Sequence, residues 1–308
     1  MAYFIYDRKN SSQMQTKTSD KIVLITGCDS GFGSQLARRL DRHGFQVIAG
    51  VINTEGDGAK SLRADCSSRV KIVKMDVTKE EDVKSIVPIV EEMKGTLWAV
   101  VNNAGIGTSG FFDWGHDIDE FRRVFEVNVF GLVRVTKYMM PLLKRSPGSR
   151  LVNMASLAGR ISSPYLSHYS MTKHAVRSFS DSIRRELAIT GDNVHVVTIE
   201  PTYYQTAIIQ TVNATQGIDR LWNETPLLTQ KSYTDESRKR QTKQQLKTSK
   251  MTRTNINEVI DVMADAVRLM EPKVYYRCCG YLDVILWAVS HAPEIILDRA
   301  IALSHRNN

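Results

Sequence analysis

Short apolar runs rich in valine and isoleucine alternate with helical patterns along most of this 308-residue chain. The runs that we predict as buried strands are Lys21–Thr26, Gln46–Ile52, Val70–Met75, Leu97–Asn102, Arg150–Ala155, Val194–Glu200 and Val274–Cys278. The predicted helices between and after them are Phe32–His43, Lys79–Met93, Asp119–Leu143, Ser167–Ile189 and Asn255–Met270. This alternation predicts an α/β fold with a doubly wound parallel sheet of about seven strands and helices on both faces. In such sheets, ligands bind beyond the carboxyl ends of the strands.

The positive charge of the chain is concentrated in one segment. The formal net charge is +8, and Lys231–Arg253 holds eight Lys and Arg against two acids, a local charge of +6. This segment is interpreted as a solvated surface or, alternatively, as a contact with anionic lipid headgroups. Nucleic acid is not expected as a partner, because Tyr233 is the only aromatic residue in the segment and no recognition motif accompanies it.

The four cysteines, Cys28, Cys66, Cys278 and Cys279, lack the spacing of metal ligands, and adjacent cysteines are a poor disulfide pair. We therefore expect no metal site and a reducing compartment. The chain is not expected to be secreted, because its first apolar residues are too few for a signal peptide. No stretch reaches about 18 uninterrupted apolar residues, so no clear spanning helix is predicted.

A glycine-rich turn follows the first predicted strand. Gly27, Gly31 and Gly33 lie between that strand and the helix beginning near Phe32. Glycines permit a tight turn and a close approach of backbone to ligand, and the start of a helix favours anions. The position of the turn predicts a site for the pyrophosphate of a dinucleotide.

Tyr169 and Lys173 are four residues apart on a predicted helix and therefore share one face. There the ammonium can stabilise the phenolate and lower the tyrosine pKa from its usual value of about 10. Ser156 lies upstream, after another strand. Together with the glycine turn, these residues indicate proton transfer beside hydride transfer, which is the chemistry of an alcohol dehydrogenase.

In this order, the motifs resemble the short-chain dehydrogenase/reductase family over roughly residues 21 to 279. The residues that carry the resemblance are the Thr26–Gly33 turn, Asp76-Val77, Asn102-Asn103-Ala104-Gly105, Asn128, Ser156, Tyr169 and Lys173. The sequences Cys28–Gly33, Leu97–Gly105, Arg150–Asn153 and the tail from Gly280 are similar to the retinol and 17β-hydroxysteroid dehydrogenase branch. The resemblance implies a Rossmann-like fold and oxidation of retinols or steroid alcohols with NAD, in many members at endoplasmic reticulum membranes.

The resemblance also implies roles for single residues. Tyr169 would be the general acid/base, and Lys173 would hold the cofactor ribose and lower the Tyr169 pKa. Ser156 would orient the substrate oxygen, and Asn128 would hold a water in the proton relay. The residues assigned to the cofactor are Gly27, Asp29, Ser30, Gly31, Phe32, Gly33, Asn53, Asp76, Val77, Asn103, Ala104, Gly105, Tyr169, Lys173, Pro201 and Thr206. Those assigned to the substrate are Ser156, Tyr203, Tyr204 and Trp222.

Charge near the second predicted strand favours NAD over NADP. The turn carries Asp29, and the strand ends in Val51-Ile52-Asn53-Thr54-Glu55 without Arg or Lys. A carboxylate there would repel the 2′-phosphate of NADP. The acidic residue that usually ends this strand is not clearly placed, and Asn53 could bind either ribose.

One residue departs from the family pattern. The family usually has Pro-Gly after the sixth strand, whereas this chain has Pro201-Thr202. If that position requires a left-handed backbone, Thr202 is strained and cofactor affinity suffers.

We expect residues 1–20 to be a flexible extension and residues 21–280 to be the catalytic domain, with residues 202–254 forming a lid over the substrate. Residues 281–308 are expected to be an apolar helical tail that either packs on the domain or contacts a membrane surface. We expect the protein to lie at the endoplasmic reticulum membrane or in the cytoplasm. It is expected to be a homodimer or a membrane-docked monomer.

The predicted function is NAD-dependent interconversion of a lipophilic alcohol, retinoid or steroid, and its carbonyl. The alternative is a catalytically idle NAD-binding sensor or lipid carrier, which Thr202 alone supports. A sugar-nucleotide epimerase also pairs a tyrosine and a lysine four residues apart, but it resembles a different glycine spacing.

Overall fold

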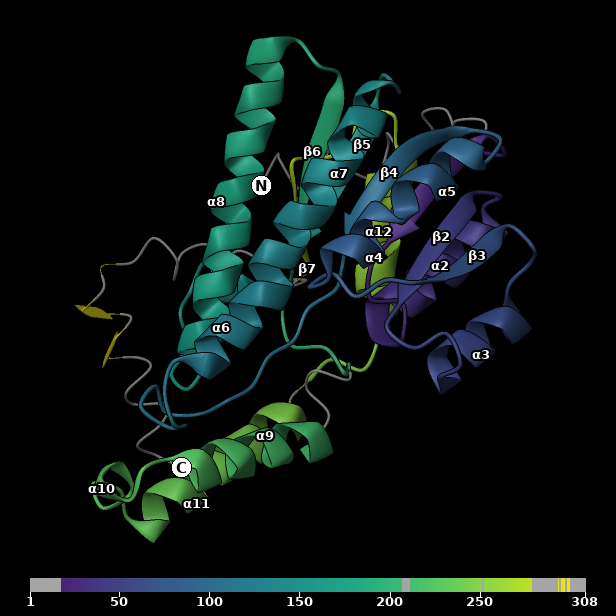
Figure 1. The fold of residues 1–308 in the computed structure, drawn as a ribbon. Helices are drawn as coiled ribbons and strands as arrows, with labels where there is room; N and C mark the ends of the chain where they lie inside the picture. The colour runs from purple at the N-terminus through teal and green to yellow at the C-terminus, as the bar shows by residue number, and fades with distance from the viewer. Residues whose placement is uncertain are drawn as a thin grey trace.

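The structure is a computed structural model that describes residues 18–206, 211–250 and 252–278, with a few positions between 293 and 299. Seven strands form one sheet in the order β3-β2-β1-β4-β5-β6-β7 (Figure 1). All neighbouring strands are parallel. The strands are β1 (Lys21–Ile25), β2 (Gln46–Val51), β3 (Val70–Lys74), β4 (Thr96–Asn102), β5 (Ser149–Met154), β6 (Val194–Pro201) and β7 (Tyr275–Cys278). The predicted fold class and the seven strands are confirmed.

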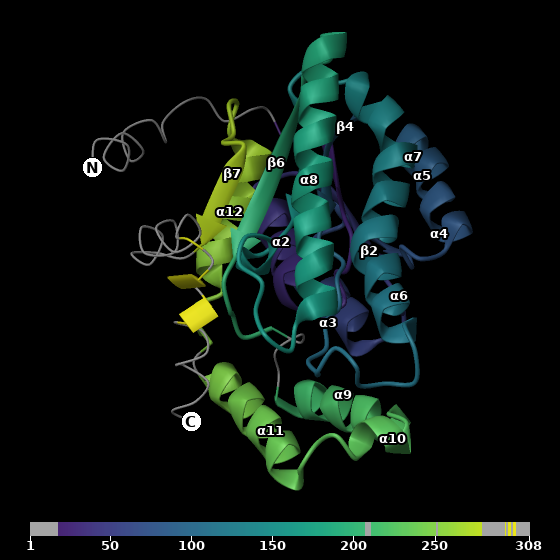
Figure 2. The same cartoon turned by 90° about the vertical axis from the view of Figure 1, so that its left-hand side faces the viewer.

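Helices cover both faces of the sheet, which explains why the central strands are apolar along nearly their whole length. One face packs against α2 (Gly31–Arg42), α3 (Asp57–Asp65) and α12 (Asn257–Arg268). The other packs against α4 (Glu80–Lys84), α5 (Ile86–Glu92), α7 (Leu132–Lys144) and the long α8 (Ser167–Thr190). Figure 2 shows α8 and α7 standing side by side on this second face.

Two of the predicted helices are interrupted. The segment Lys79–Met93 divides into α4 and α5 at Ser85 because Pro88 lacks an N–H and its ring conflicts with the carbonyl of Lys84. The segment Asp119–Leu143 divides into α6 (Asp119–Phe125), a π-helical stretch η1 (Glu126–Gly131) and α7. Helix α3 was not predicted, because its alternation of polar and small residues gives little apolar periodicity.

The lid, residues 202–254, contains three helices that the sequence analysis did not predict. They are α9 (Thr211–Glu224), α10 (Leu227–Gln230) and α11 (Asp235–Lys250). Both views place them below the carboxyl ends of the strands (Figures 1 and 2). The two ends of the lid meet in a short bridge, where Arg253 N donates to Tyr203 O at 3.0 Å and Gln205 N to Arg253 O at 3.0 Å.

The predicted N-terminal extension and C-terminal tail lie almost entirely outside the described residues. In the described part of the chain, no helix is long and apolar enough to cross a membrane. Cys28 and Cys66 are free thiols.

Candidate active site

The residues singled out from the sequence meet at the carboxyl edge of the sheet. The glycine turn follows β1, Asn103 follows β4, Ser156 follows β5 and the Pro201–Thr206 segment ends β6. Parallel strands bring these loops to one edge, and α8 brings Tyr169 and Lys173 to the same place. Their proximity is therefore a consequence of the sheet order.

The glycine turn requires glycine at defined positions. Gly27 and Gly31 have φ angles of +69° and +59°, which residues other than glycine rarely adopt. A Cβ on Gly27 would lie 2.8 Å from the Cα of Ala104, and one on Gly33 would lie 2.5 Å from Asn103 Nδ2. Asn103 in turn donates to the carbonyls of Thr26 and Gly27 at 2.9 and 3.0 Å. The turn is thus fixed against the loop after β4.

The amino end of α2 fits the pyrophosphate of a dinucleotide. Ser30 makes no side-chain cap on this helix, and the first turn holds no acidic residue. The N–H groups and the dipole of α2 are therefore available to an anion, because no carboxylate in the first turn competes for them. A Cβ built on Gly31 would lie 3.8 Å from Thr206, so Thr206 stands beside this turn.

Asp29 occupies the position that the sequence analysis could not fill. Its carboxylate accepts hydrogen bonds from the backbone N–H of Ile52 at 3.0 Å and of Asn53 at 3.5 Å. The negative charge therefore lies at the carboxyl end of β2, although Asp29 follows β1 in the sequence. The Asn53 side chain closes its own turn by accepting from Glu55 N at 3.0 Å.

Asp76 and Val77 lie at the end of β3. The Asp76 carboxylate accepts from the backbone N–H and the hydroxyl of Thr78 at 2.9 and 2.8 Å. Val77 is buried, and a Cβ on Gly131 would lie 2.6 Å from its side chain. Both residues fix the loop after β3, beside the start of α7.

Ser156, Tyr169 and Lys173 form a compact group. Ser156 lies close enough to Tyr169 to lower the pKa of the phenol, and its hydroxyl donates to Pro201 O at 3.4 Å. The Lys173 ammonium lies 5.5 Å from the centre of the Tyr169 ring and donates to Met154 O at 2.9 Å. The group can therefore present a phenol and a hydroxyl to one substrate oxygen, with a cation behind them.

The pKa of Tyr169 differs from the sequence-based expectation. Burial raises it to about 12, with the hydrogen bond from Ser156 acting in the opposite direction. Burial also lowers the pKa of Lys173 to about 8. The expected lowering by Lys173 is not observed, because the ammonium is directed at Met154 O and desolvation of the phenol outweighs its field.

Asn128 connects the loop after β4 with α8. Its side chain accepts from Ile106 N at 2.8 Å and donates to Ile106 O at 2.9 Å and to Thr172 Oγ1 at 3.1 Å. Thr172 then donates to Tyr169 O at 2.7 Å. Asn128 lies in the π-helical stretch η1, an irregularity frequent at functional sites. The hydrogen bonds of this side chain therefore hold the backbone of α8 in place.

The strain expected at Thr202 is absent. Among the described residues other than glycine, Tyr165 is the one with a positive φ, so Thr202 does not need a left-handed backbone. The Thr202 hydroxyl donates to Cys278 O at 3.2 Å and joins β6 to the end of β7. The departure from the Pro-Gly pattern therefore has an ordinary packing role.

The predicted substrate residues separate into two groups. Tyr203 is 39% exposed and close enough to Tyr169 to contribute to its raised pKa. Tyr204 is 1% exposed, and its hydroxyl donates to Glu258 and Cys278 O, both at 2.8 Å. These contacts are those of a packing residue at the base of the lid, and they give the substrate role predicted for Tyr204 no support.

Trp222 belongs to an aromatic cluster between the lid and the loop after β4. Its ring lies 4.8 Å from that of Trp114 and 6.4 Å from that of Tyr233. Ile218, Leu221 and Phe111 complete the cluster. The Trp222 ring therefore packs within the aromatic cluster, and these contacts give no support to its predicted role in substrate binding.

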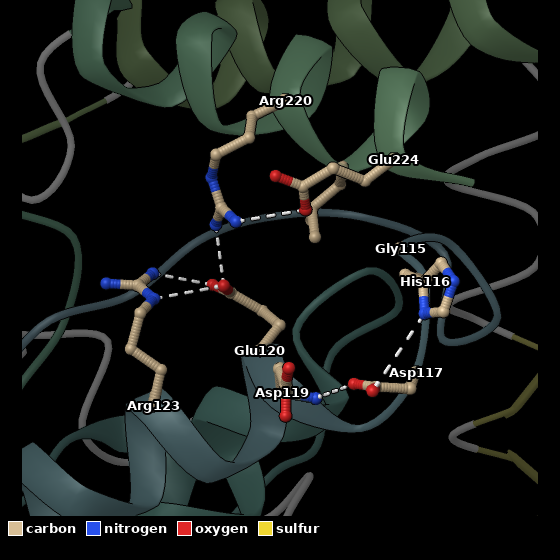
Figure 3. A pocket seen from close by; sticks show the side chains of 9 residues that line it. Gly115, His116, Asp117, Asp119, Glu120, Arg123, Arg220 and Glu224 are labelled. Atoms are coloured by element: carbon tan, nitrogen blue, oxygen red, sulfur yellow. Dashed lines mark hydrogen bonds and ion pairs between the residues drawn. The ribbon is translucent and has the colours of Figure 1, made fainter.

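The sequence analysis missed a cavity of about 330 Å³ between α6 and α9 (Figure 3). On its floor Glu120 accepts from Arg123 at 2.6 Å and from Arg220 at 2.6 Å. The spacing of Glu120 and Arg123 on a helix was a signal for the first pair. No local signal joins Glu120 to Arg220, which is 100 residues away in the chain.

Together, the sheet order, the glycine turn and the group on α8 define a dinucleotide-dependent oxidoreductase with a Rossmann-like fold. The short-chain dehydrogenase family model matches residues 21–217. The chain belongs to the short-chain dehydrogenase/reductase family.

Among curated proteins, the chain is 35% identical to bovine (Bos taurus) 17-beta-hydroxysteroid dehydrogenase type 6 over 98% of its own length and 94% of that protein. It is also 35% identical to mouse (Mus musculus) retinol dehydrogenase 16, over 93% of this chain and 89% of that one. These relatives indicate the branch that holds retinol and hydroxysteroid dehydrogenases.

Among solved structures, a short chain dehydrogenase/reductase from Burkholderia phymatum in complex with NAD has a TM-score of 0.72. It shares 23% identity and covers 88% of this chain and 93% of its own. At this identity, the likeness bears on the fold alone, and it agrees with the parallel sheet described above.

Proposed function

We propose that this protein interconverts a lipophilic alcohol, retinoid or steroid, and its carbonyl, with NAD(H) as the cofactor and Tyr169 as the acid/base. The single observation that carries the proposal is the grouping of Ser156, Tyr169 and Lys173 at the carboxyl edge of the sheet, with the Lys173 ammonium 5.5 Å from the centre of the Tyr169 ring. A bound nicotinamide ring supplies the hydride acceptor or donor at this edge.

The residues of the chain then have defined tasks. Ser156 donates a hydrogen bond to the substrate oxygen and fixes the reacting carbon. The Tyr169 hydroxyl takes the alcohol proton during oxidation and returns it during reduction. Lys173 keeps a positive charge near the phenol, which favours the phenolate as the proton leaves. Asn128 holds the backbone of α8 in place through Thr172.

NAD is favoured over NADP by the position of Asp29. Its carboxylate lies at the carboxyl end of β2, where the adenosine ribose of a dinucleotide is held in this fold. The 2′-phosphate of NADP would place negative charge beside it, whereas the 2′-hydroxyl of NAD can donate to it.

A lipophilic substrate is supported by the two relatives and by the aromatic wall. The relatives are named for retinol and for a hydroxysteroid. Phe111 is half-buried and Tyr203 is 39% exposed, so both present aromatic surface in and beside the lid. Bulky apolar ligands require such walls with few polar groups.

The test is NADH formation at 340 nm by the purified protein, with NAD or NADP and a panel of all-trans-retinol, androstanediol and estradiol. Tyr169→Phe is the matched control, since it removes one hydroxyl and leaves the ring. We expect turnover with NAD that falls roughly 100- to 10,000-fold in the control. Binding of NADH without turnover on any alcohol would favour the idle sensor or lipid carrier and would overturn the proposal.

We further propose that the lid contacts an anionic membrane surface from which such substrates are taken. Leu227 and Leu228 are 75% and 82% exposed on α10. Lys239, Lys243 and Lys247 are exposed at intervals of four residues along α11 and so share one face of that helix. A segment that exposes both apolar side chains and cations is suited to a bilayer surface that carries negative headgroups.

Flotation of the full chain with phosphatidylcholine vesicles, with and without phosphatidylserine, tests this contact. The variant Leu227→Ser/Leu228→Ser should lose binding to both, and replacing the three lysines by glutamine should lose only the preference for phosphatidylserine. A control with Lys60, Lys71 and Lys84 changed to glutamine removes the same charge away from the lid. Equal loss in this control would assign the effect to net charge and would refute a lid contact.

A further inference from the structure

Apolar and ionic contacts join the lid to the loop after β4 and to α6. The aromatic cluster of Trp114, Leu221 and Tyr233 is apolar, and Tyr233 adds a hydrogen bond to Asp113 at 2.6 Å. The second contact is ionic: Arg220 Nη2 on the lid helix α9 lies 2.6 Å from Glu120 Oε2 on α6. Figure 3 shows Arg220 reaching from the lid towards Glu120, while Arg123 approaches the same carboxylate from α6.

Glu120 is a strong partner for these cations. Its side chain is 7% exposed, and although burial opposes ionisation, the bonds from Arg123, Thr108 and Arg220 lower its pKa to about 2. A charged hydrogen bond that is shielded from water is stronger than one at the surface. Arg220 remains 42% exposed, so it is the member of the pair that can leave when the lid moves.

A chain of hydrogen bonds leads from this carboxylate to the catalytic helix. Thr108 Oγ1 donates to Glu120, and His168 Nε2 lies 2.8 Å from Thr108 Oγ1 and 3.1 Å from Thr108 O. His168 is 3% exposed and immediately precedes Tyr169 in the first turn of α8. Burial lowers the pKa of His168, so a neutral ring that donates from Nε2 fits both contacts.

From this geometry we propose that Arg220 is a latch that holds the lid closed on Glu120. Thr108 and His168 carry its effect to the first turn of α8, so that closing the lid also fixes the backbone at Tyr169. Arg220 touches neither the phenol nor the lysine and is therefore a positioning residue. The kinetic part of this inference rests on the proposed function, whereas the coupling of lid and helix does not.

The test compares Arg220→Ala with Arg238→Ala in the full chain. Arg238 pairs with Asp219 at 2.9 Å, so its removal breaks an ion pair within the lid and leaves the contact with α6 intact. Hydrogen–deuterium exchange is measured on peptides covering α9 and the first turn of α8. We expect Arg220→Ala to speed exchange at least fivefold in both, and Arg238→Ala to leave the first turn of α8 unchanged.

Two further variants separate the latch from simple packing. Arg220→Lys should restore most of the protection, because it keeps a cation within reach of Glu120. Glu120→Gln should reproduce the exchange pattern of Arg220→Ala at the first turn of α8. If Arg220→Ala speeds exchange in α9 alone, or Arg238→Ala affects α8 equally, the proposed coupling is wrong.

Kinetics provide the second measurement. With the lid less often closed, KM for the lipophilic alcohol should rise about tenfold in Arg220→Ala, while kcat at saturating substrate changes less than threefold. A loss carried by kcat with KM unchanged would contradict a latch. Since exchange is measured without substrate, inactivity on every alcohol would refute the proposed function and leave the latch to be judged by exchange.

Discussion

At the carboxyl edge of the sheet, three of the four candidate catalytic side chains are held by hydrogen bonds to the backbone of another segment, whereas the aromatic side chains of the lid are held mainly by contacts with other aromatic rings. Lys173 donates a hydrogen bond to Met154 O, and Ser156 donates one to Pro201 O. The Asn128 side chain accepts from Ile106 N and donates to Ile106 O. From the lid, the Trp222 ring contacts Trp114 and the Tyr233 ring contacts Phe111, both with ring centres 4.8 Å apart and both across to the loop after β4. The hydrogen bonds fix the direction of each polar side chain, whereas the ring contacts fix an apolar surface.

This contrast corresponds to two different requirements. Proton and hydride transfer need one geometry whatever the alcohol, and backbone bonds at the end of a parallel sheet provide it. A wall for a bulky apolar substrate needs area more than direction, and ring contacts provide that. Substitutions on the sheet should therefore affect the reaction itself, while those in the lid should affect which substrate is held and how tightly.

Among the variants that test this contrast, a change at Lys173 should have the largest effect. The buried ammonium of Lys173 lowers the stability of the fold but serves the reaction. Lys173→Met should lower turnover on the order of 100-fold, because the charge behind the phenol is lost. The same change should raise the free energy of unfolding at pH 7 by about 3 kcal/mol, since burial lowers the Lys173 pKa from 10.5 to about 8 and each pKa unit corresponds to about 1.4 kcal/mol. Activity assays and urea denaturation measure the two effects on one sample.

The pH dependence of this gain has a definite sign. Between about 8 and 10.5 the folded protein binds fewer protons at Lys173 than the unfolded chain, so wild-type stability rises with pH in that window. The stability difference from Lys173→Met should therefore be greatest at neutral pH and vanish near pH 10.5. A difference that is constant with pH would mean that the buried ammonium is not its cause.

A smaller effect is expected at Asp29, on the cofactor side of the sheet. Asp29→Asn keeps an acceptor for the N–H of Ile52 but removes the charge. The ratio of the dissociation constants for NADPH and NADH should fall about tenfold, as expected for a weakened repulsion near the surface. Fluorescence titration with both cofactors measures the ratio, and an unchanged ratio would show that Asp29 does not select the cofactor.

The sheet was predictable from sequence because its strands are continuous apolar runs and its loops carry motifs at their ends. The same reasoning could not place Asp29 at the end of β2, because Asp29 follows β1 and the two strands are brought together only by pairing. Nor could it give the sign of the Tyr169 pKa shift. Spacing predicts that Lys173 is near, but desolvation of the phenol depends on everything packed around it.

The helices of the predicted lid could not be given from the sequence. A break in the strand and helix rhythm predicted a lid over residues 202–254, but α11 within it is strongly polar and has little apolar periodicity. The pair Arg220 and Glu120 joins two segments far apart in the chain, and such contacts leave no local pattern. Tyr203 and Tyr204 also show what the sequence cannot predict. They are adjacent and chemically identical, yet Tyr203 is partly exposed and Tyr204 is buried.

Those two tyrosines provide the finest test of the contrast between sheet and lid. Tyr204→Phe removes bonds to Glu258 and Cys278 O and should cost about 1 to 2 kcal/mol of stability, with KM nearly unchanged. Tyr203→Ala removes an aromatic ring that is 39% exposed and should raise KM about fivefold, equivalent to about 1 kcal/mol of lost apolar contact, with little change in stability.

Urea denaturation and KM on the best alcohol of the panel measure both variants side by side. Each variant is the control for the other, because the changed residues are adjacent and differ in what surrounds them. A rise in KM for Tyr204→Phe that matches the one for Tyr203→Ala would mean that the base of the lid transmits its packing to the substrate wall. In that case the lid would be as directionally constrained as the sheet, and the division between the two regions would not hold.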